Sequence, residues 1–175
     1  EMIFEDFTTD QSFDLCLFSE SYQYIPLDQG LPKALSLVKP GGTVIVSDVF
    51  RRDAYFIDKP KNRVVGGGHQ ISKFRAMLET LPASVAHEED ITDATAPSID
   101  IESGLFHVLG FAYTRTDQAL ATGKPKLWAA AKWMWRRVMS AKRREKLDQR
   151  LNGDERTSAM FSKYNVYLML KITKT

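Results

Sequence analysis

Short apolar runs and helical stripes alternate along the first fifty residues of the chain. Residues 13–18 form an almost continuous apolar run between polar neighbours, which is typical of a strand buried on both faces. Apolar positions then recur at helical spacing over residues 27–38, and Lys39-Pro40-Gly41-Gly42 ends that helix. A second, β-branched run follows over residues 43–48. This order of strand, helix, glycine turn and strand predicts a βαβ unit whose two strands are adjacent and parallel.

The next segment is more polar and less regular. Residues 51–68 mix charges of both signs and close with Gly66-Gly67-Gly68, which indicates a loop. Apolar spacing then predicts a helix over residues 72–81, with Ser72 as its cap. Residues 84–91 have the pattern of a weaker, polar strand, which we expect near the edge of a sheet.

The last third of the chain is predominantly helical. Helical periodicity extends over residues 100–120, and a basic helix or helix pair is expected over residues 127–151. A short helix is expected over residues 157–161. Residues 164–172 alternate apolar and polar positions with a period of two, which predicts a closing strand in antiparallel placement.

Composition restricts the class of protein. The 175 residues are 43% hydrophobic and 26% charged, which fits one folded domain with a packed core. The net charge of +2 argues against a uniformly basic coat, so we expect no nucleic-acid partner. Cys16 is the only cysteine, which excludes an intramolecular disulfide framework. No apolar run reaches the roughly 20 residues of a membrane span and no signal pattern opens the chain, so we expect a cytoplasmic location and no stable membrane insertion.

Several of these segments together resemble a known family. Three consecutive segments resemble the second half of class I S-adenosylmethionine-dependent methyltransferases. They are the strand that contains Phe13-Asp14, the helix after it and the Lys39-Pro40-Gly41-Gly42 entry into the next strand. Phe4-Glu5-Asp6-Phe7 looks like the end of the preceding strand, and Lys163–Lys174 resembles the antiparallel final strand of the family. Residues 69–81, 88–92 and 96–97 resemble a branch that acts on small molecules.

The resemblance implies an α/β fold with a Rossmann-like methyltransferase sheet that is incomplete at its N-terminus. It makes residues 1–175 a single, partial methyltransferase-like domain, in which residues 95–162 form a helical insertion or lid before the last strand. The family's glycine-rich loop and the acidic residue ending its second strand have no counterpart here. We therefore expect the chain to begin at the third strand of the fold and, alone, to bind S-adenosylmethionine weakly or not at all.

Candidate site residues follow from the resemblance and from their places at strand ends. Methyl transfer takes its activated group from the cofactor, so the protein mainly orients the acceptor and excludes water. His69, after the glycines, is the candidate base. The residues expected to bind the cofactor are Asp6, Phe7, Ser19 and Glu20. The residues expected to bind the acceptor are Ser21, Tyr24 and Asp48. Each has an ordinary structural interpretation as well, and no spacing indicates a metal site.

A basic segment leaves the function open. Residues 124–151 contain ten basic and two acidic residues, and Trp128 and Trp135 are seven apart on one helical face. Such a helix could cover a pocket for an acidic small-molecule acceptor, contact an acidic partner, rest on an anionic membrane or simply face solvent. Methyl transfer is the leading hypothesis. The alternatives are a non-catalytic Rossmann-like remnant that binds an acidic partner and, less favoured, a nicotinamide-dependent oxidoreductase.

Overall fold

The computed structural model describes residues 2–60, 66–153 and 156–175 and divides the chain into two compact units. The first unit joins Glu1–Ala96 to Ala159–Thr175 and is an α/β layer structure. The second unit, Pro97–Ser158, is helical. The helical unit is therefore inserted between the third and fourth strands of the first, while its role as a lid stays a prediction.

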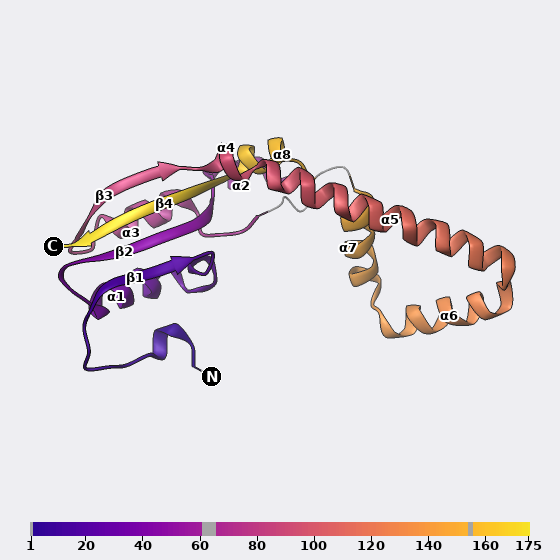
Figure 1. Ribbon diagram of the computed structural model, residues 1–175, viewed down its shortest axis with the longest axis horizontal. Coiled ribbons are helices and arrows are strands. Elements are labelled where there is room, and N and C mark those ends of the chain that lie inside the picture. The colour runs from indigo at the N-terminus through magenta and orange to yellow at the C-terminus, as the bar shows by residue number, and fades with distance from the viewer. Residues whose placement is uncertain (1, 61–65, 154–155) are drawn as a thin grey trace. The chain divides into compact units, whose positions relative to one another are not determined.

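One four-stranded sheet organises the α/β unit (Figure 1). Its strands are β1 (Phe13–Ser19), β2 (Val38–Arg51), β3 (Ala83–Asp90) and β4 (Asn165–Lys174), in the order β1-β2-β4-β3. Strands β1 and β2 are parallel, and β4 runs antiparallel to both β2 and β3. The adjacent parallel pair, the antiparallel closing strand and the edge position of β3 confirm the sequence predictions.

Short helices connect these strands. They are η1 (Phe4–Asp6), η2 (Tyr22–Tyr24), α1 (Leu27–Leu37), α2 (Asp53–Asp58), α3 (Ile71–Leu78), α4 (Thr92–Thr95) and α8 (Ser158–Tyr164). Three differ from the sequence predictions. Phe4–Asp6 is a 3₁₀ turn rather than a strand end, α2 occupies part of the expected loop, and α3 begins after Gln70. Ser72 does not cap α3, because its hydroxyl donates to the Asp53 carboxylate at 2.7 Å. Residues 61–65 of the expected loop lie outside the described residues.

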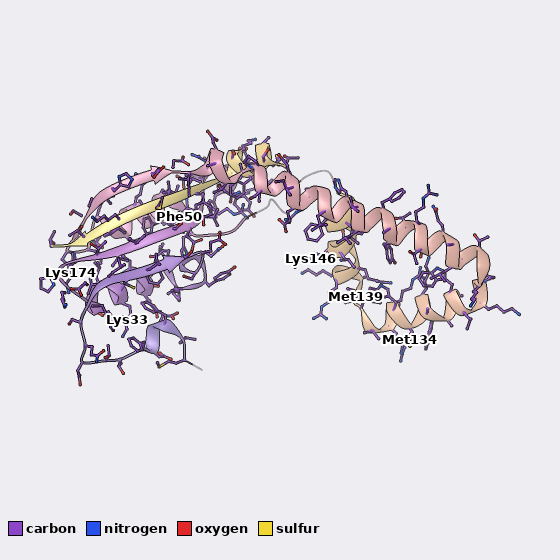
Figure 2. All side chains as sticks on the ribbon, viewed as in Figure 1. Lys33, Phe50, Met134, Met139, Lys146 and Lys174 are labelled. Carbon is purple, nitrogen blue, oxygen red and sulfur yellow. The ribbon has the colours of Figure 1, made fainter. Side chains whose placement is uncertain are left out.

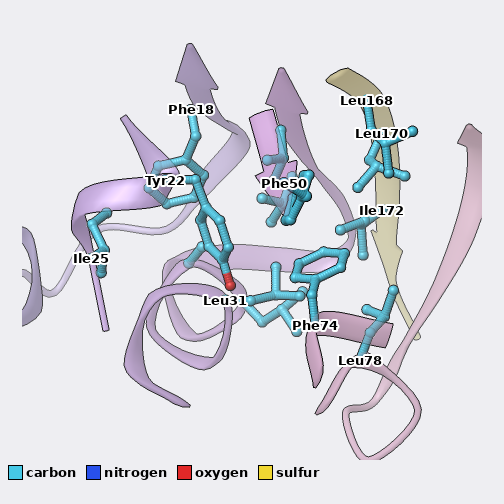
Figure 3. Close-up of a cluster of buried hydrophobic side chains, with 14 of the residues drawn as sticks. Phe18, Tyr22, Ile25, Leu31, Phe50, Phe74, Leu78, Leu168, Leu170 and Ile172 are labelled. Carbon is cyan, nitrogen blue, oxygen red and sulfur yellow. The ribbon is translucent and has the colours of Figure 1, made fainter. Parts of the chain in front are cut away.

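The core lies between one face of the sheet and helices α1 and α3. Alternate residues of a strand point to the same face, so β2 and β4 each contribute every second side chain. These buried side chains are Val44, Val46 and Phe50 of β2 and Val166, Leu168, Leu170 and Ile172 of β4. Figure 3 shows Phe50 beside Phe74 of α3, with a distance of 4.7 Å between their ring centroids. Tyr22 of η2 completes the aromatic cluster, at 5.7 Å from Phe74.

The opposite face of the sheet is more open. Leu15 and Leu17 of β1 are 50% and 59% exposed, and Met169 of β4 is also exposed. In the described part of the chain, β1 pairs only with β2, so its outer edge carries no neighbouring strand. Strand β1 is therefore largely exposed, as is the edge strand β3. The expectation that β1 is buried on both faces is wrong.

The helical unit contains α5 (Pro97–Gly123), α6 (Pro125–Val138) and α7 (Ala141–Asn152). The basic segment is thus a helix pair, and Ser140 caps α7 by accepting a hydrogen bond from the backbone of Arg143. Ion pairs join Lys132 to Asp117 and Arg156 to Glu102 within this unit. Among the described residues, no helix is both long and apolar enough to cross a membrane.

The aromatic cluster should carry much of the stability of the α/β unit. Phe74 is buried against Phe50 and Tyr22, so Phe74→Ala should lower the free energy of unfolding by about 3–5 kcal/mol through lost burial and a residual cavity. The exposed Phe111 is the matched control, and Phe111→Ala should change it by less than about 0.5 kcal/mol. Chemical denaturation followed by circular dichroism measures both. Equal effects of the two substitutions would contradict this core assignment.

Candidate active site

Three strands bring polar side chains to one edge of the sheet. Because β1 and β2 are parallel, their carboxyl ends meet at the same edge, where open α/β sheets place their ligands. Strand β4 is antiparallel to β2 and therefore begins at this edge. The register places Ser19 beside Ser47, and Val49 beside Tyr167. The start of the closing strand thus joins the site expected from the ends of β1 and β2.

Glu20 has an unusual backbone conformation directly after β1. Its φ of 50° lies in the left-handed region, which is uncommon for residues other than glycine and concentrates at functional sites. The Glu20 amide donates to the carbonyl of Ser47 at 2.9 Å. Its exposed carboxylate accepts a hydrogen bond from the Tyr167 hydroxyl at 3.0 Å. The conformation therefore fixes a negative charge at the carboxyl edge of the sheet, between the exposed Ser19 and the half-buried Ser21.

Tyr167 is a site residue that the sequence reasoning missed. Burial raises the pKa of its hydroxyl, and the Glu20 charge acts in the same direction, while a hydrogen bond with Ser47 opposes both. Tyr167 therefore stays protonated and keeps its hydrogen available for Glu20. The available signal was topological: an antiparallel closing strand has to start where the parallel strands end.

Asp48 lies inside β2 rather than at its end, because the strand continues to Arg51. This corrects the expectation that Asp48 ends its strand. Only 1% of Asp48 is exposed. Its two carboxylate oxygens accept hydrogen bonds from the backbone amides of Gln23 at 3.0 Å and Val49 at 2.7 Å. Burial raises the pKa of Asp48, and the charge of Glu20 adds to the rise, whereas the backbone hydrogen bonds work against it. Asp48 thus fastens the η2 turn to the sheet, and a contact with an acceptor stays a prediction.

The glycine run before His69 packs against the chain's own backbone. Gly68 has a φ of +88°, and a Cβ there would lie 1.9 Å from the carbonyl oxygen of Val49. A Cβ on Gly66, which has the same φ, would lie 2.8 Å from Asn165 Oδ1. These glycines permit a close approach of two chain segments. They do not leave a glycine-rich loop open to a cofactor.

His69 is oriented by η2. Its Nε2 lies 3.2 Å from the carbonyl oxygen of Tyr22, and its ring meets the Tyr22 ring edge-on at 5.5 Å. A carbonyl oxygen only accepts hydrogen bonds, so neutral His69 carries its proton on Nε2. Nδ1 is then the nitrogen that can accept a proton. The Arg51 amide holds this segment through a 2.8 Å hydrogen bond to the His69 carbonyl.

The remaining predicted site residues are less closely connected to this edge. Asp6 and Phe7 lie at and after the η1 turn rather than in a strand, and Phe4 of that turn contacts Phe18 near the end of β1, with 5.2 Å between ring centroids. Tyr24 is the last residue of η2 and is 81% exposed. Glu20, Ser47 and Tyr167 therefore form the connected part of the site.

Comparisons with known proteins place the fold. No family model matches the sequence, and no curated protein sequence matches it. Among solved structures, the mycolic acid cyclopropane synthase CmaA1 superposes with a TM-score of 0.58 at 13% identity, over 98% of this chain and 58% of that one. Geranyl diphosphate C-methyltransferase from Streptomyces coelicolor gives 0.54 at 10% identity, over 98% of this chain and 51% of that one. The [4+2]-cyclase SpnF gives 0.51 at 15% identity, over 99% and 54%.

The fold is that of the class I methyltransferases. The adjacent parallel strands β1 and β2 and the antiparallel β4 are the part of this fold that the sequence analysis predicted, whereas the place of β4 between β2 and β3 comes from the structure. The chain spans about half the length of the solved structures that it matches.

The described residues supply only part of the cofactor site that this methyltransferase fold implies. Ser19 and Glu20 offer polar groups at the carboxyl edge of the sheet. The space beside Gly66 and Gly68, however, is occupied by Asn165 and Val49. No group of three or more His, Cys, Asp or Glu side chains within the described ranges is arranged to hold a metal ion. The site as described can orient charged and hydrogen-bonding groups, while a complete cradle for S-adenosylmethionine is not formed by these residues alone.

The raised pKa of Asp48 predicts a specific pH dependence of stability. The folded state holds the proton more tightly than the unfolded chain, whose Asp pKa is about 3.9. The stabilising contribution of this proton is therefore complete below about pH 3.9 and is lost as the pH rises through the folded pKa. Relative to wild type, Asp48→Asn should thus become progressively less destabilising, or more stabilising, as the pH rises.

Chemical denaturation at a series of pH values measures this difference. Asp53 is the control, because hydrogen bonds from Ser72 and Gln70 lower the pKa of its carboxyl group. The loss caused by Asp53→Asn should therefore grow as the pH rises, with the opposite slope. If the difference in unfolding free energy between wild type and Asp48→Asn did not change with pH, the raised pKa of Asp48 would be contradicted.

Proposed function

We propose that this chain is the C-terminal part of the catalytic domain of an S-adenosylmethionine-dependent methyltransferase that acts on a small-molecule acceptor. The observation that carries the proposal is the negatively charged Glu20, held in a left-handed conformation and bonded to Tyr167, at the carboxyl edge of a methyltransferase sheet. Solved proteins with this fold include geranyl diphosphate C-methyltransferase, crystallised with S-adenosylhomocysteine.

Within this proposal, Ser19 and Glu20 bind the cofactor and Asp6 and Phe7 lie on its adenine side. S-adenosylmethionine supplies an activated methyl group on a sulfonium, so its displacement needs alignment more than covalent chemistry from the protein. A fixed carboxylate such as Glu20 favours positively charged groups nearby through Coulomb attraction. The Tyr167 hydroxyl restricts the rotamers of Glu20, so the charge is positioned before a ligand binds.

The acceptor side is assigned to Ser21, Tyr24, Asp48 and His69. With Nε2 engaged by the Tyr22 carbonyl, Nδ1 of His69 is the atom that would take a proton from an acceptor hydroxyl or amine. Asp48 keeps η2 and its neighbours in place through Gln23. The acidic character of the acceptor and the cytoplasmic location stay predictions.

Two observations bear on the alternatives. The same fold occurs in the [4+2]-cyclase SpnF, so the sheet alone does not fix methyl transfer. Gly66 and Gly68 pack against other parts of the chain and leave no space for a cofactor beside them. If no further segment supplies the missing loop, this packing favours a non-catalytic domain. Binding of S-adenosylmethionine by the complete gene product is therefore the property that separates the hypotheses.

Isothermal titration with S-adenosylmethionine tests the proposal on both residues 1–175 and the complete gene product. We expect measurable binding by the complete product and weak or no binding by residues 1–175, because Gly66 and Gly68 of the latter pack against Asn165 and Val49. Glu20→Ala in the complete product should weaken binding at least about tenfold, a change of about 1.4 kcal/mol. Its melting temperature should change by less than about 4 °C.

The matched control is Glu79→Ala, which removes an exposed carboxylate that follows α3. It should leave the titration unchanged. Tight binding by residues 1–175 would show that the glycine loop is dispensable. Absence of binding by the complete product would reject the methyltransferase proposal in favour of a non-catalytic domain.

A further inference from the structure

Helix α6 has two chemically distinct faces. A helix repeats every 3.6 residues, so Leu127, Met134 and Val138 lie on one face, with Trp135 beside them. Lys126, Arg136 and Arg137 lie on the remaining surface of the helix, together with Trp133. None of the 14 residues of α6, all of which are described, is acidic.

The apolar face of α6 is open to solvent. Val138 is 77% exposed, Leu127 69% and Met134 60%, and Trp135 is also exposed. Figure 2 labels Met134 on this helix. Large apolar side chains gathered on one surface mark an interaction site in soluble proteins.

An apolar hollow adjoins this face. Its volume is about 520 Å³, and it lies between α6 and Tyr113 of α5. Trp128, Met134, Trp135 and Val138 contribute most of its wall from α6. The hollow extends the apolar surface of α6 inward and offers room for hydrocarbon rather than for a polar ligand.

The second property of this surface is the positive charge of the basic residues around it. Exposed basic side chains continue from α6 into α7 at Lys142, Arg143 and Lys146. Residues 124–151 contain ten basic and two acidic residues in all. This concentration of positive charge complements a dense array of anionic groups.

We propose that α6 lies on an anionic lipid bilayer, with its apolar face at the boundary between headgroups and acyl chains. Amphipathic helices that bind membranes in this way combine Trp and Leu on one face with Lys and Arg on the other, and they sink about 5–10 Å into the interface. The basic side chains of α6 and α7 contact the anionic headgroups. An acidic protein would match the charge as well, and failure to bind anionic vesicles would leave such a protein as the occupant.

The three tryptophans of the chain give a direct test, because Trp128, Trp133 and Trp135 all lie in α6. The tryptophan fluorescence of residues 1–175, excited selectively, therefore reports on this helix alone. The chain should co-sediment with vesicles of equal parts phosphatidylcholine and phosphatidylglycerol, and its emission should shift to the blue. Pure phosphatidylcholine vesicles should bind it far more weakly. Raising the salt from about 0.1 M to about 1 M, which shortens the screening length from about 10 Å to about 3 Å, should release much of the bound protein.

Two pairs of substitutions separate the charge from the apolar face. Arg136→Gln with Arg137→Gln should reduce partitioning into anionic vesicles about thirtyfold, as expected for two basic residues near an anionic surface. Leu127→Gln with Val138→Gln should abolish the blue shift, and neither pair should alter the helical circular dichroism, because these side chains are exposed. Lys73→Gln with Lys171→Gln is the control, since both lysines are exposed basic residues of the α/β unit. It should leave partitioning unchanged.

Several outcomes would overturn the proposal. They are equal binding to both kinds of vesicle, binding without a change in Trp emission, or an equal loss in the Lys73/Lys171 control. A concentration-dependent dimer that shields the tryptophans and ignores vesicles would assign the apolar face to a second copy instead. None of these measurements uses S-adenosylmethionine, so their result is independent of the proposed methyl transfer.

Discussion

The antiparallel pairing of β4 with β2 is the interaction on which the rest of the α/β unit depends. The ladder runs from Thr43 beside Thr173 to Arg51 beside Asn165. It aligns the apolar side chains of the two strands, Ile172 with Val44, Leu170 with Val46 and Val166 with Phe50. This shared face holds α1 and α3. The same ladder brings Tyr167 to the edge where β1 and β2 end. The strand that completes the core therefore also supplies the hydroxyl that orients Glu20.

The sequence alone was sufficient for elements whose local pattern and tertiary environment agree. The Lys39-Pro40-Gly41-Gly42 entry into β2 and the alternation in β4 each predict a strand whose burial matches the pattern. The apolar run of β1 predicts its strand correctly, but not its burial, because Leu15 and Leu17 are exposed. Predictions were wrong where no such pattern exists. Residues 4–6 have apolar neighbours but form a 3₁₀ turn without strand pairing, and α2 lies in a charged segment that indicated a loop.

The site was less predictable because its contacts join distant parts of the chain. Glu20 and Tyr167 are 147 positions apart, and only the order of the strands brings them together. Asp48 looked like a strand-end ligand, although the strand extends past it and both of its oxygens are used by backbone amides. Local sequence identified the edge of the sheet correctly, while the pairing of side chains at that edge required the topology.

Hydrogen exchange of individual backbone amides tests the central position of β4 most directly. A strand between two neighbours has all of its amides paired, whereas an edge strand leaves every second amide exposed. We expect slow exchange at consecutive amides from Leu168 to Ile172 and an alternating pattern along β3. Alternating exchange along β4 would place it at the edge of the sheet and contradict both the methyltransferase topology and the position of Tyr167 at the site.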